Sequence, residues 1–289
     1  MTCEVTFSAN DYKSDLKPVW CPGCGDFAVL NSVYRALADL QCAPHDTVSV
    51  SGIGCSSRLP GYVETYGFNS LHGRALPIAT GVKLASPKLN VVAVGGDGDG
   101  IAIGGNHFLH SARRNVDIAY IMMDNEIYGL TKGQAGPTTP SGDKTKSTTY
   151  GNPDPTVDPC GMAIALGASW VARGFSGDVK GTTELMKQAI RHRGFAFLNI
   201  ISPCVTWRGD HQSKELRAKM RQIPADHDVT NREAALRFTD EAEPLTVGVL
   251  YAVARPTLVD RMTDIANRAR GDKKPPTREE FLASFRPVA

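Results

Sequence analysis

The sequence predicts an α/β fold built on a doubly wound, mainly parallel sheet. Short apolar runs alternate with segments of helical periodicity from about residue 26 to residue 203, which is the order of strands and crossover helices. The runs "NVVAVGG" and "FAFLNII" are continuously apolar, as expected for strands covered by helices on both faces. Glycines follow several of the runs and mark turns between strand and helix.

The first half of this pattern begins with a helix. "DFAVLNSVYRALADL" (26–40) places apolar residues at helical spacing, and Asp26 at its start is a candidate N-cap. "TVSVSGIG" (47–54) predicts a strand that runs into a glycine turn, and "LPIATGVKLA" (76–85) predicts a helix. "LNVVAVGGDG" (89–98) predicts a buried strand ending in glycines. "NHFLHSARRN" (106–115) and "DIAYIMMDN" (117–125) predict the next helix and strand.

The second half contains a long polar connection. Residues 131–159 are rich in Gly, Pro, Ser and Thr, and a loop of this length in a compact domain is usually a lid, a binding loop or a disordered segment. "GMAIALGASWVAR" (161–173) predicts a helix leading into a strand. "TTELMKQAIRHRG" (182–194) and "FAFLNIISPC" (195–204) predict one more helix and strand, after which helical patterns become scattered.

Composition excludes several classes of protein. The 32 basic and 30 acidic side chains give a net charge of +2, without the bias of a nucleic-acid-binding surface. No apolar run reaches the roughly 18 residues of a membrane helix, and the polar start of the chain does not resemble a secretory signal. Seven cysteines fit reduced thiols or metal ligands better than a disulfide framework, so we expect a cytoplasmic protein.

A loop of glycines and acids is the first candidate site. "GGDGDG" (95–100) lies at the end of a predicted strand, where open α/β sheets bind ligands. Neither common nucleotide loop fits, because no Gly-Lys-Ser/Thr follows and isoleucines occupy positions 101 and 103. Asp97 and Asp99 favour a divalent ion that bridges to a phosphate, since Mg²⁺ prefers oxygen ligands. The alternative is a strand-to-helix turn that binds nothing.

A second oxygen donor is expected at the end of the neighbouring strand. Asn125 follows "DIAYIMMD", and 26 residues separate it from Gly98. A GDG sequence followed at about this distance by Asn resembles the motif of enzymes dependent on thiamine diphosphate (ThDP). Asp124 stands where that motif usually has a first asparagine. The residue that binds the metal in that motif is the second asparagine, which corresponds to Asn125. Asp124 therefore differs from the motif only at the position beside the ligand.

The motif resemblance implies a role for each matching residue. Asp97 and Asn125 would bind Mg²⁺ through their side chains, and Ile127 would bind it through its backbone carbonyl. The residues expected beside the diphosphate are Gly98, Asp99, Gly129 and Leu130.

Four cysteines form the second candidate site. Cys21 and Cys24 lie in "WCPGCG", Cys55 follows a predicted strand in "GIGCSSR", and Cys204 follows another in "SPC". Four thiolates suit Zn²⁺ and an iron-sulfur cluster equally well, so the residues alone leave both groups open. The remaining cysteines are Cys3, Cys42 and Cys160, and no role is assigned to them.

The order of the motifs adds a family resemblance. "WCPGCG", "GIGCSSR", "HGRA", "GDGD", "DNEIYGLTKGQ" and "SPC" together resemble the β subunit of a 2-oxoacid:ferredoxin oxidoreductase, most of all the 2-oxoglutarate type. The resemblance covers roughly residues 15–210. It implies a sheet of the ThDP diphosphate-domain type in a ThDP- and 4Fe-4S-binding domain over residues 1–210, with a C-terminal helical extension or tail over 211–289. Cys21, Cys24, Cys55 and Cys204 would then be the ligands of one 4Fe-4S cluster.

The same resemblance implies further contacts. The stretch of Ile53, Gly54, Cys55 and Ser56 would touch the cofactor. His72 in "LHGRA" would lie beside it as a catalytic residue, although a histidine at the start of a helix is often satisfied by backbone alone. Lys132 would face the substrate, although a lysine in a polar loop is usually only solvated.

The implied reaction is decarboxylation of a 2-oxoacid, with electrons passing through the cluster to ferredoxin and the acyl group to coenzyme A, or the reverse reductive carboxylation. ThDP also needs a glutamate from a pyrimidine-binding domain, and the sequence contains one ThDP-type domain only. We therefore expect an α subunit that carries this glutamate, an αβ or (αβ)₂ assembly, and no activity of the chain alone.

Three alternative functions remain at this stage. A pyruvate enzyme of the same family shares every motif quoted above. A non-oxidative ThDP enzyme would explain the GDG loop and Asn125 but not the four cysteines. A zinc-stabilised binding module would use the cysteines structurally and leave the glycine loop as a turn.

Overall fold

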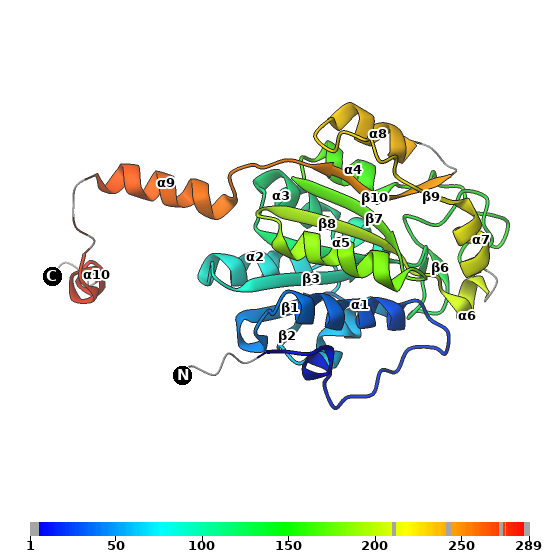
Figure 1. Cartoon of the computed structure of the whole chain (residues 1–289), viewed down its shortest axis with the longest axis horizontal. Coiled ribbons are helices and arrows are strands. Elements are labelled where there is room, and N and C mark those ends of the chain that lie inside the picture. The colour runs from blue at the N-terminus through cyan, green and yellow to red at the C-terminus, as the bar shows by residue number, and fades with distance from the viewer. Residues whose placement is uncertain (1–5, 210–211, 241–243, 272–273, 275, 286–289) are drawn as a thin grey trace.

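The computed structural model describes residues 6–209, 212–240, 244–271, 274 and 276–285. Eight strands form one sheet in the order β2-β1-β3-β4-β8-β7-β10-β9 (Figure 1). Their bounds are β1 (Thr47–Ser51), β2 (Tyr66–Asn69), β3 (Asn90–Gly96), β4 (Ile118–Asp124), β7 (Trp170–Phe175), β8 (Phe195–Ile201), β9 (Met220–Gln222) and β10 (Leu245–Ala252). All neighbours are parallel except β7 and β10. The α/β fold with a mainly parallel sheet is confirmed.

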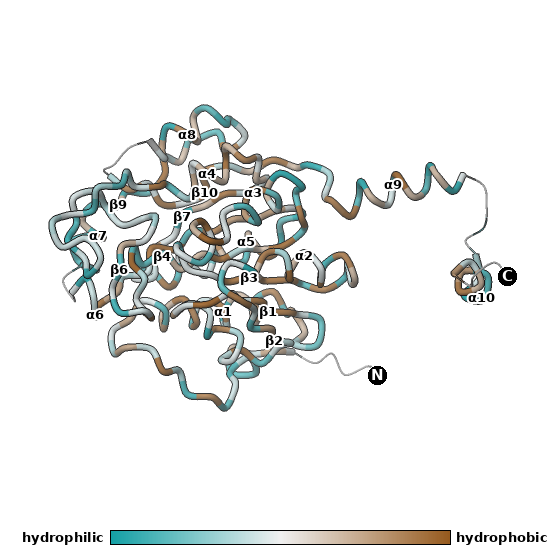
Figure 2. The backbone as a smooth tube through the Cα atoms, turned by 180° about the vertical axis from the view of Figure 1, so that it is seen from behind, coloured by the Kyte–Doolittle hydropathy of each residue, from teal (hydrophilic) through white to brown (hydrophobic). Residues whose placement is uncertain are grey.

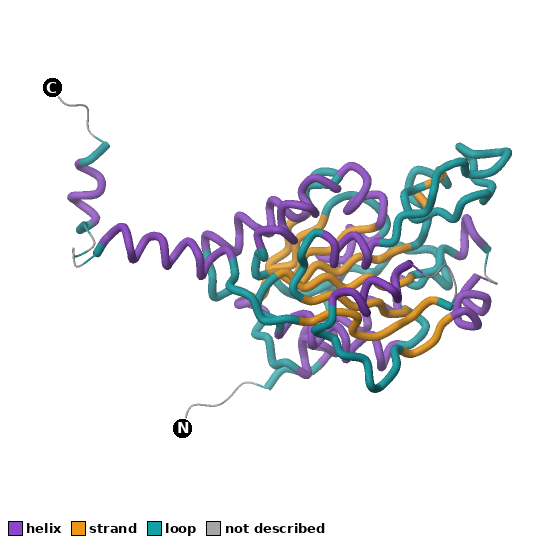
Figure 3. The backbone as a smooth tube through the Cα atoms, turned by 90° about the horizontal axis from the view of Figure 1, so that it is seen from above, coloured by secondary structure: helices purple, strands orange, loops and turns teal. Residues whose placement is uncertain are grey.

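Helices cover both faces of the sheet, as the view from above shows (Figure 3). The helices are α1 (Asp26–Asp39), α2 (Ala75–Ala85), α3 (Gly105–Arg114), α4 (Pro159–Ala165), α5 (Val179–Arg191), α6 (Val205–Arg208), α7 (Gln212–Lys219), α8 (Arg232–Asp240), α9 (Leu258–Arg270) and α10 (Arg278–Ala283). Two short strands, β5 (Ile127–Tyr128) and β6 (Gln134–Ala135), form a separate antiparallel pair.

The alternation of side chains along each strand divides the interior into two hydrophobic cores. In β3, Val92 and Val94 pack with α1 and α5, whereas Val91 and Ala93 pack with α2, α3 and α4 on the other face. The central strands accordingly supply many residues of both cores, and hydrophobic segments, drawn in brown, run through the body of the molecule (Figure 2). A fully buried side chain such as Leu198 contributes about 1.5–3 kcal/mol to folding. The central strands are therefore a rigid base for the loops that follow them.

Many of the candidate residues follow the carboxyl ends of four parallel strands and so lie at one edge of the sheet. Strands β1, β3, β4 and β8 are consecutive in the sheet, and their carboxyl ends meet there. Cys55 follows β1, Asp97 follows β3, Asn125 follows β4 and Cys204 follows β8. The glycine-acid loop and two of the four cysteines therefore lie on neighbouring connections of the same sheet edge.

Two local expectations differ from the structure. Asp26 is not the N-cap of α1, since Gly25 holds that position and no side chain caps the helix. Its carboxylate is buried and accepts a hydrogen bond of 2.7 Å from the Ser202 hydroxyl, because α1 begins against the end of β8. The segment after residue 210 contributes β9 and β10 to the main sheet in addition to helices.

The C-terminal helices leave the body of the molecule (Figures 1 and 3). Neither α9 nor α10 has a buried residue, and capping boxes at Thr257 and Thr277 start the two helices. Within the described part of the chain, no helix combines the length and the hydropathy needed to cross a bilayer.

Candidate active site

A cavity of about 200 Å³ opens at the carboxyl edge of the sheet, between the loops after β1, β3 and β4. It brings together the three residues expected to bind Mg²⁺ and all of those expected to touch ThDP. Its lining includes Ile53, Gly54, Cys55, Ser56, His72, Asp97, Gly98, Asp99, Asn125, Ile127, Gly129 and Leu130. Lys132 is outside this lining and is exposed in a left-handed conformation with φ of 80°, so its catalytic role stays a prediction.

Buried carboxylates at the base of the cavity suit a divalent cation. Asp97 is 2% exposed, and burial together with nearby Asp124 raises its pKa well above the usual range. Thr138 Oγ1 lies 3.0 Å from Asp97 Oδ2 and 2.8 Å from Asp124 Oδ1, so one hydroxyl bridges the two acids. A bound Mg²⁺ would favour the charged form of Asp97 and offset the cost of burying it.

The second expected ligand is held by its own turn. The Asn125 side-chain oxygen accepts a hydrogen bond of 3.1 Å from the backbone N–H of Ile127. This Asx-type turn places the amide oxygen and the next residues at the end of β4, beside the loop that follows β3. The donor set of one carboxylate, one amide and one backbone carbonyl is the hard oxygen chemistry that Mg²⁺ requires.

Glycine at position 98 makes room for the wall of the cavity. A β-carbon at Gly98 would come within 2.2 Å of the Tyr128 ring, so any other residue would displace that ring. The Tyr128 hydroxyl lies 3.4 Å from the Gly98 carbonyl oxygen. This close approach explains why the loop between β3 and α3 carries glycine beside the expected diphosphate, and it fits an elongated anion next to the backbone.

His72 is oriented by Asp99. The ring Nδ1 lies 2.9 Å from Asp99 Oδ1, and the same oxygen accepts hydrogen bonds from Gly73 N at 2.7 Å and Ile53 N at 2.9 Å. Because a carboxylate accepts, Nδ1 carries the proton and Nε2 is free to face the cavity. The expected diphosphate neighbour Asp99 thus ties three loops together instead of pointing its oxygens at the cavity alone.

The four cysteines of the second candidate site are electrostatic neighbours. Burial, the nearby Asp26 carboxylate and the neighbouring cysteine sulfurs together raise the pKa of Cys24 strongly and that of Cys55 to about 12. Burial and Cys21 likewise raise the pKa of Cys204. The raised pKa values make Cys24, Cys55 and Cys204 reluctant to ionise alone, and a cationic iron or zinc centre would favour their thiolates because it reverses the sign of the local field. No group of three or more His, Cys, Asp or Glu side chains in the described ranges is arranged to chelate a single ion.

Hydrogen bonds fix the "WCPGCG" segment against the other cysteine loops. The Trp20 indole N–H donates to the Cys55 carbonyl at 2.7 Å, and the Gly25 N–H donates to the Pro203 carbonyl at 3.4 Å. Cys21 is exposed, whereas the other three thiols are half-buried. Of the cysteines without an assigned role, Cys42 and Cys160 are buried away from this group, and Cys3 lies outside the described residues.

Sequence reasoning missed three residues of the site. Tyr128 forms a wall of the cavity, Thr138 bridges the two buried acids, and the Trp207 indole N–H donates to the Gly129 carbonyl at 2.9 Å. Tyr128 lies inside the quoted motif "DNEIYG" and Trp207 lies three residues after Cys204. Thr138 comes from the long polar loop, where nothing in the local pattern distinguishes it from its neighbours.

Two known protein families match this chain over most of the residues that form the site. Residues 52–200 match the family described as "Thiamine pyrophosphate enzyme, C-terminal TPP binding domain". Residues 204–267 match the family of the C-terminal part of the pyruvate ferredoxin oxidoreductase β subunit. The first match contains the whole of the cavity lining, and the second begins at Cys204.

Curated relatives and a solved structure agree with the family matches. The chain is 49% identical to 2-oxoacid:ferredoxin oxidoreductase 2, subunit beta, of Aeropyrum pernix, over 68% of this chain and 64% of that one. It is 47% identical to 2-oxoglutarate oxidoreductase subunit KorB of Mycobacterium tuberculosis, over 70% of this chain and 54% of that one. It is 37% identical to 2-oxoglutarate synthase subunit KorB of Methanocaldococcus jannaschii, over 89% of this chain and 96% of that one. The chain thus spans less than two thirds of the first two relatives and nearly all of the third.

The structural comparison covers almost the whole chain. A solved structure of 2-oxoglutarate:ferredoxin oxidoreductase from Magnetococcus marinus, with 2-oxoglutarate, coenzyme A and succinyl-CoA bound, superimposes with a TM-score of 0.91. The match covers 97% of each chain at 41% identity, so it includes the sheet edge that carries the cavity.

Proposed function

Because the chain belongs to the family of 2-oxoacid:ferredoxin oxidoreductase β subunits, we propose that it is the β subunit of a 2-oxoglutarate:ferredoxin oxidoreductase. One observation carries the proposal: the GDG loop, Asn125 and His72 line one cavity, and Cys55 joins that cavity to the group of four thiols. Two of the relatives and the solved structure name 2-oxoglutarate, which favours this substrate over pyruvate.

The cofactors of the proposal are ThDP, Mg²⁺ and one 4Fe-4S cluster. When bound, ThDP would supply a nucleophile for the keto carbon and an electron sink for decarboxylation, and the cluster would supply one-electron transfer. Asp97, Asn125 and the Ile127 carbonyl would hold Mg²⁺, and Gly98 lets the backbone approach the diphosphate. Cys21, Cys24, Cys55 and Cys204 would hold the cluster.

His72 and its partner Asp99 are the proton-handling groups of the proposed site. Asp99 holds the Nδ1 proton, so Nε2 can accept a proton or, once protonated, donate a hydrogen bond to a substrate carboxylate in the cavity. His72 is 36% exposed in this chain, which leaves it accessible to a substrate that enters from the open side. Ile53 and Leu130 are exposed apolar residues at the same opening and would exclude water when a partner covers them.

The remaining parts of the proposal concern partners. An α subunit would contribute the glutamate for the ThDP pyrimidine and cover the cavity in an αβ or (αβ)₂ assembly. Coenzyme A and ferredoxin would be the acyl and electron acceptors. Free thiols and an oxygen-sensitive cluster suit a reducing compartment such as the cytoplasm.

Cluster and cofactor content test this proposal before any turnover is measured. The chain is co-expressed with its α subunit, purified without oxygen, and assayed for iron, acid-labile sulfide, zinc and ThDP. A brown αβ complex with iron, sulfide and ThDP is expected. The matched pair of variants is Cys204→Ser, which should lose iron, and Cys42→Ser, which should retain it because Cys42 lies outside the proposed ligand set. A colourless protein with zinc and without ThDP would support the binding module instead.

A further inference from the structure

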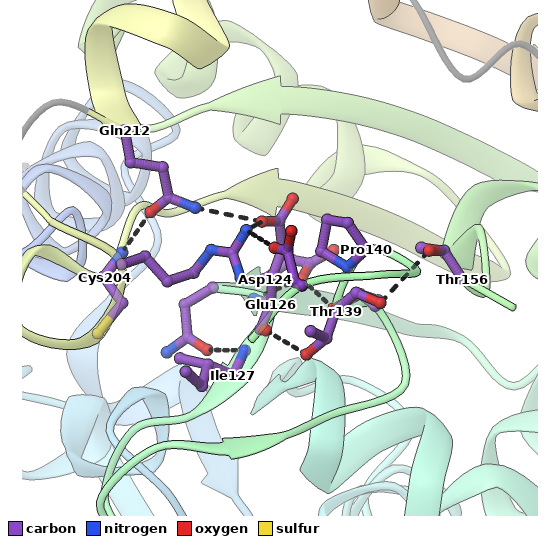
Figure 4. Close-up of polar contacts among 12 residues, drawn as sticks. Asp124, Glu126, Ile127, Thr139, Pro140, Thr156, Cys204 and Gln212 are labelled. Carbon is purple, nitrogen blue, oxygen red and sulfur yellow. Dashed lines mark hydrogen bonds and ion pairs between the residues drawn. The ribbon is translucent and has the colours of Figure 1, made fainter. Parts of the chain in front are cut away.

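Two segments that serve different cofactors in the proposed function are joined by side chains. The segment after β4 carries Asn125 and Ile127, and the segment after β8 carries Cys204. Gln212 bridges them: its Oε1 accepts from the Cys204 backbone N–H at 3.2 Å, and its Nε2 donates to Glu126 Oε2 at 3.1 Å (Figure 4). Gln212 is only 6% exposed, so water competes little for these two hydrogen bonds.

Arg208 strengthens the same bridge. Its guanidinium lies 3.1 Å from Glu126 Oε2 and 2.6 Å from Asp143 Oδ2, and the side chains of both Arg208 and Glu126 are 15% exposed. An ion pair at this degree of burial, supported by the hydrogen bond from Gln212, restricts both partners more than a surface pair would. Asp143 belongs to the long loop, so that loop is held in the same network.

A second contact between the two segments is made by Trp207 and Gly129. The Trp207 indole N–H donates to the Gly129 carbonyl at 2.9 Å, and the Lys146 ammonium lies 4.5 Å from the centre of the Trp207 ring. Residues 126–129 are therefore attached to Trp207, Arg208 and Gln212 through Glu126 and Gly129. A displacement of either segment alone would break these contacts.

Glu126 has a backbone conformation that needs support. Its φ of 58° is left-handed, which costs a residue with a β-carbon about 1–2 kcal/mol. Its N–H donates to Asp124 Oδ1 at 3.3 Å, and its carbonyl accepts from the Thr139 hydroxyl at 2.5 Å. Residues in such conformations are retained where the surroundings over-determine them and are concentrated at functional sites. Here the conformation directs the Glu126 side chain to Arg208 and Gln212, while its two neighbours line the cavity.

We propose that Glu126, Arg208 and Gln212 are positioning residues that couple the Mg²⁺–diphosphate site to the cluster ligand Cys204. Filling the diphosphate site fixes residues 125–129, and the bridge transmits this constraint to the backbone at Cys204, whose N–H is held by Gln212. The inference rests on the proposed function. Because a coupling free energy is reciprocal, the redox state of the cluster must alter the affinity for Mg²⁺–ThDP by the same factor as the cofactor alters reduction of the cluster.

The test measures this reciprocity in the anaerobic αβ complex. The midpoint potential and the electron paramagnetic resonance spectrum of the reduced cluster are recorded with and without Mg²⁺–ThDP, and ThDP affinity is measured with the cluster oxidised and reduced. For the wild type we expect at least a fivefold difference in affinity between the two redox states, which corresponds to about 40 mV at 59 mV per tenfold for one electron.

Three variants separate the bridge from general damage. Gln212→Leu removes both hydrogen bonds, and Gln212→Glu keeps an acceptor for Cys204 but removes the donor to Glu126. Both should reduce the difference in affinity to less than about twofold while ThDP and iron content stay at wild-type levels. Gln188→Leu, on the exposed face of α5, is the matched control and should behave as the wild type. If Gln212→Leu fails to assemble, Gln212→Glu decides the question.

The outcomes distinguish the coupling from the function beneath it. A wild-type complex that holds cluster and ThDP and turns over, but shows equal ThDP affinity in both redox states, overturns the coupling and leaves the proposed function standing. Wild-type behaviour in both Gln212 variants also overturns it. A complex without cluster or ThDP removes the proposed function and the coupling with it.

Discussion

Asp99 allows the local structure of the cavity to be tested through one side chain. A single carboxylate oxygen, Oδ1, accepts hydrogen bonds from Ile53 N, His72 Nδ1 and Gly73 N at 2.7–2.9 Å. Asp99 is 3% exposed, and the Gly73 N–H is buried with it. Asp99→Ala would therefore leave one buried and one half-buried backbone donor without a partner, in addition to releasing His72.

The expected cost follows from those donors. An unsatisfied buried donor costs about 1–3 kcal/mol, and the half-buried one less, so we expect Asp99→Ala to lower the free energy of unfolding by about 2–4 kcal/mol. Asp99→Asn keeps an oxygen acceptor but not the charge, and should cost about 1 kcal/mol. Both values are measured by urea denaturation of the cofactor-free chain, with Asp226→Ala at an exposed position as the control.

The two variants also separate stability from function. Asp99→Asn should fold, bind Mg²⁺–ThDP and keep the His72 tautomer, yet lose the negative charge that favours a protonated His72, so the pH profile of turnover should change shape while cofactor affinity changes little. If Asp99→Ala stayed within about 0.5 kcal/mol of the wild type, a typical effect of a surface substitution, the network at Oδ1 would not hold the three loops together and the reasoning would be refuted.

Three further predictions concern other parts of the chain. Asp97→Asn should weaken Mg²⁺-dependent ThDP binding, measured by calorimetry, at least tenfold, or about 1.4 kcal/mol. The same variant should stabilise the metal-free chain, because burial and Asp124 raise the pKa of Asp97. Wild-type affinity in the variant would exclude Asp97 as a metal ligand. Burial lowers the pKa of His192, so the unfolded chain takes up a proton that the folded chain does not, and stability should be complete above pH 6.5 and fall below it. His192→Gln should flatten that fall in urea titrations, and an unchanged slope would assign it to other groups. Removal of residues 272–289 should leave the melting temperature of the isolated chain unchanged, because α10 has no buried residue, whereas a drop of several degrees would show that the body depends on this segment.

The parts of the fold that could be predicted are those with strong local signals. The continuously apolar sequences of β3, β4 and β8 are typical of buried parallel strands, and the polar residues that follow them fall at one sheet edge by topology alone. Strand-end topology placed Asp97 and Asn125 at this edge, whereas the other residues of the cavity lining that were predicted came from the resemblance to the ThDP motif and family.

The parts that could not be predicted depend on long-range contacts. Strand β10 carries a glycine and a register shift between Val249 and Tyr251, and it is a strand because it pairs antiparallel with β7. The sequence predicts Asp26 as a helix cap, but its carboxylate instead accepts a hydrogen bond from Ser202, which follows β8. Thr138, Trp207 and Gln212 reach the site from segments without a periodic pattern, so only the tertiary structure reveals their partners.

The most direct test of the central claim is reduction of ferredoxin by the anaerobically purified αβ complex, with 2-oxoglutarate and pyruvate compared in parallel and coenzyme A present or omitted. The account predicts coenzyme A-dependent reduction with 2-oxoglutarate, much slower reduction with pyruvate, and none with the β chain alone. Reduction with pyruvate only would contradict the substrate assignment. A complex with bound ThDP and cluster that reduces ferredoxin with neither acid would contradict the proposed activity itself.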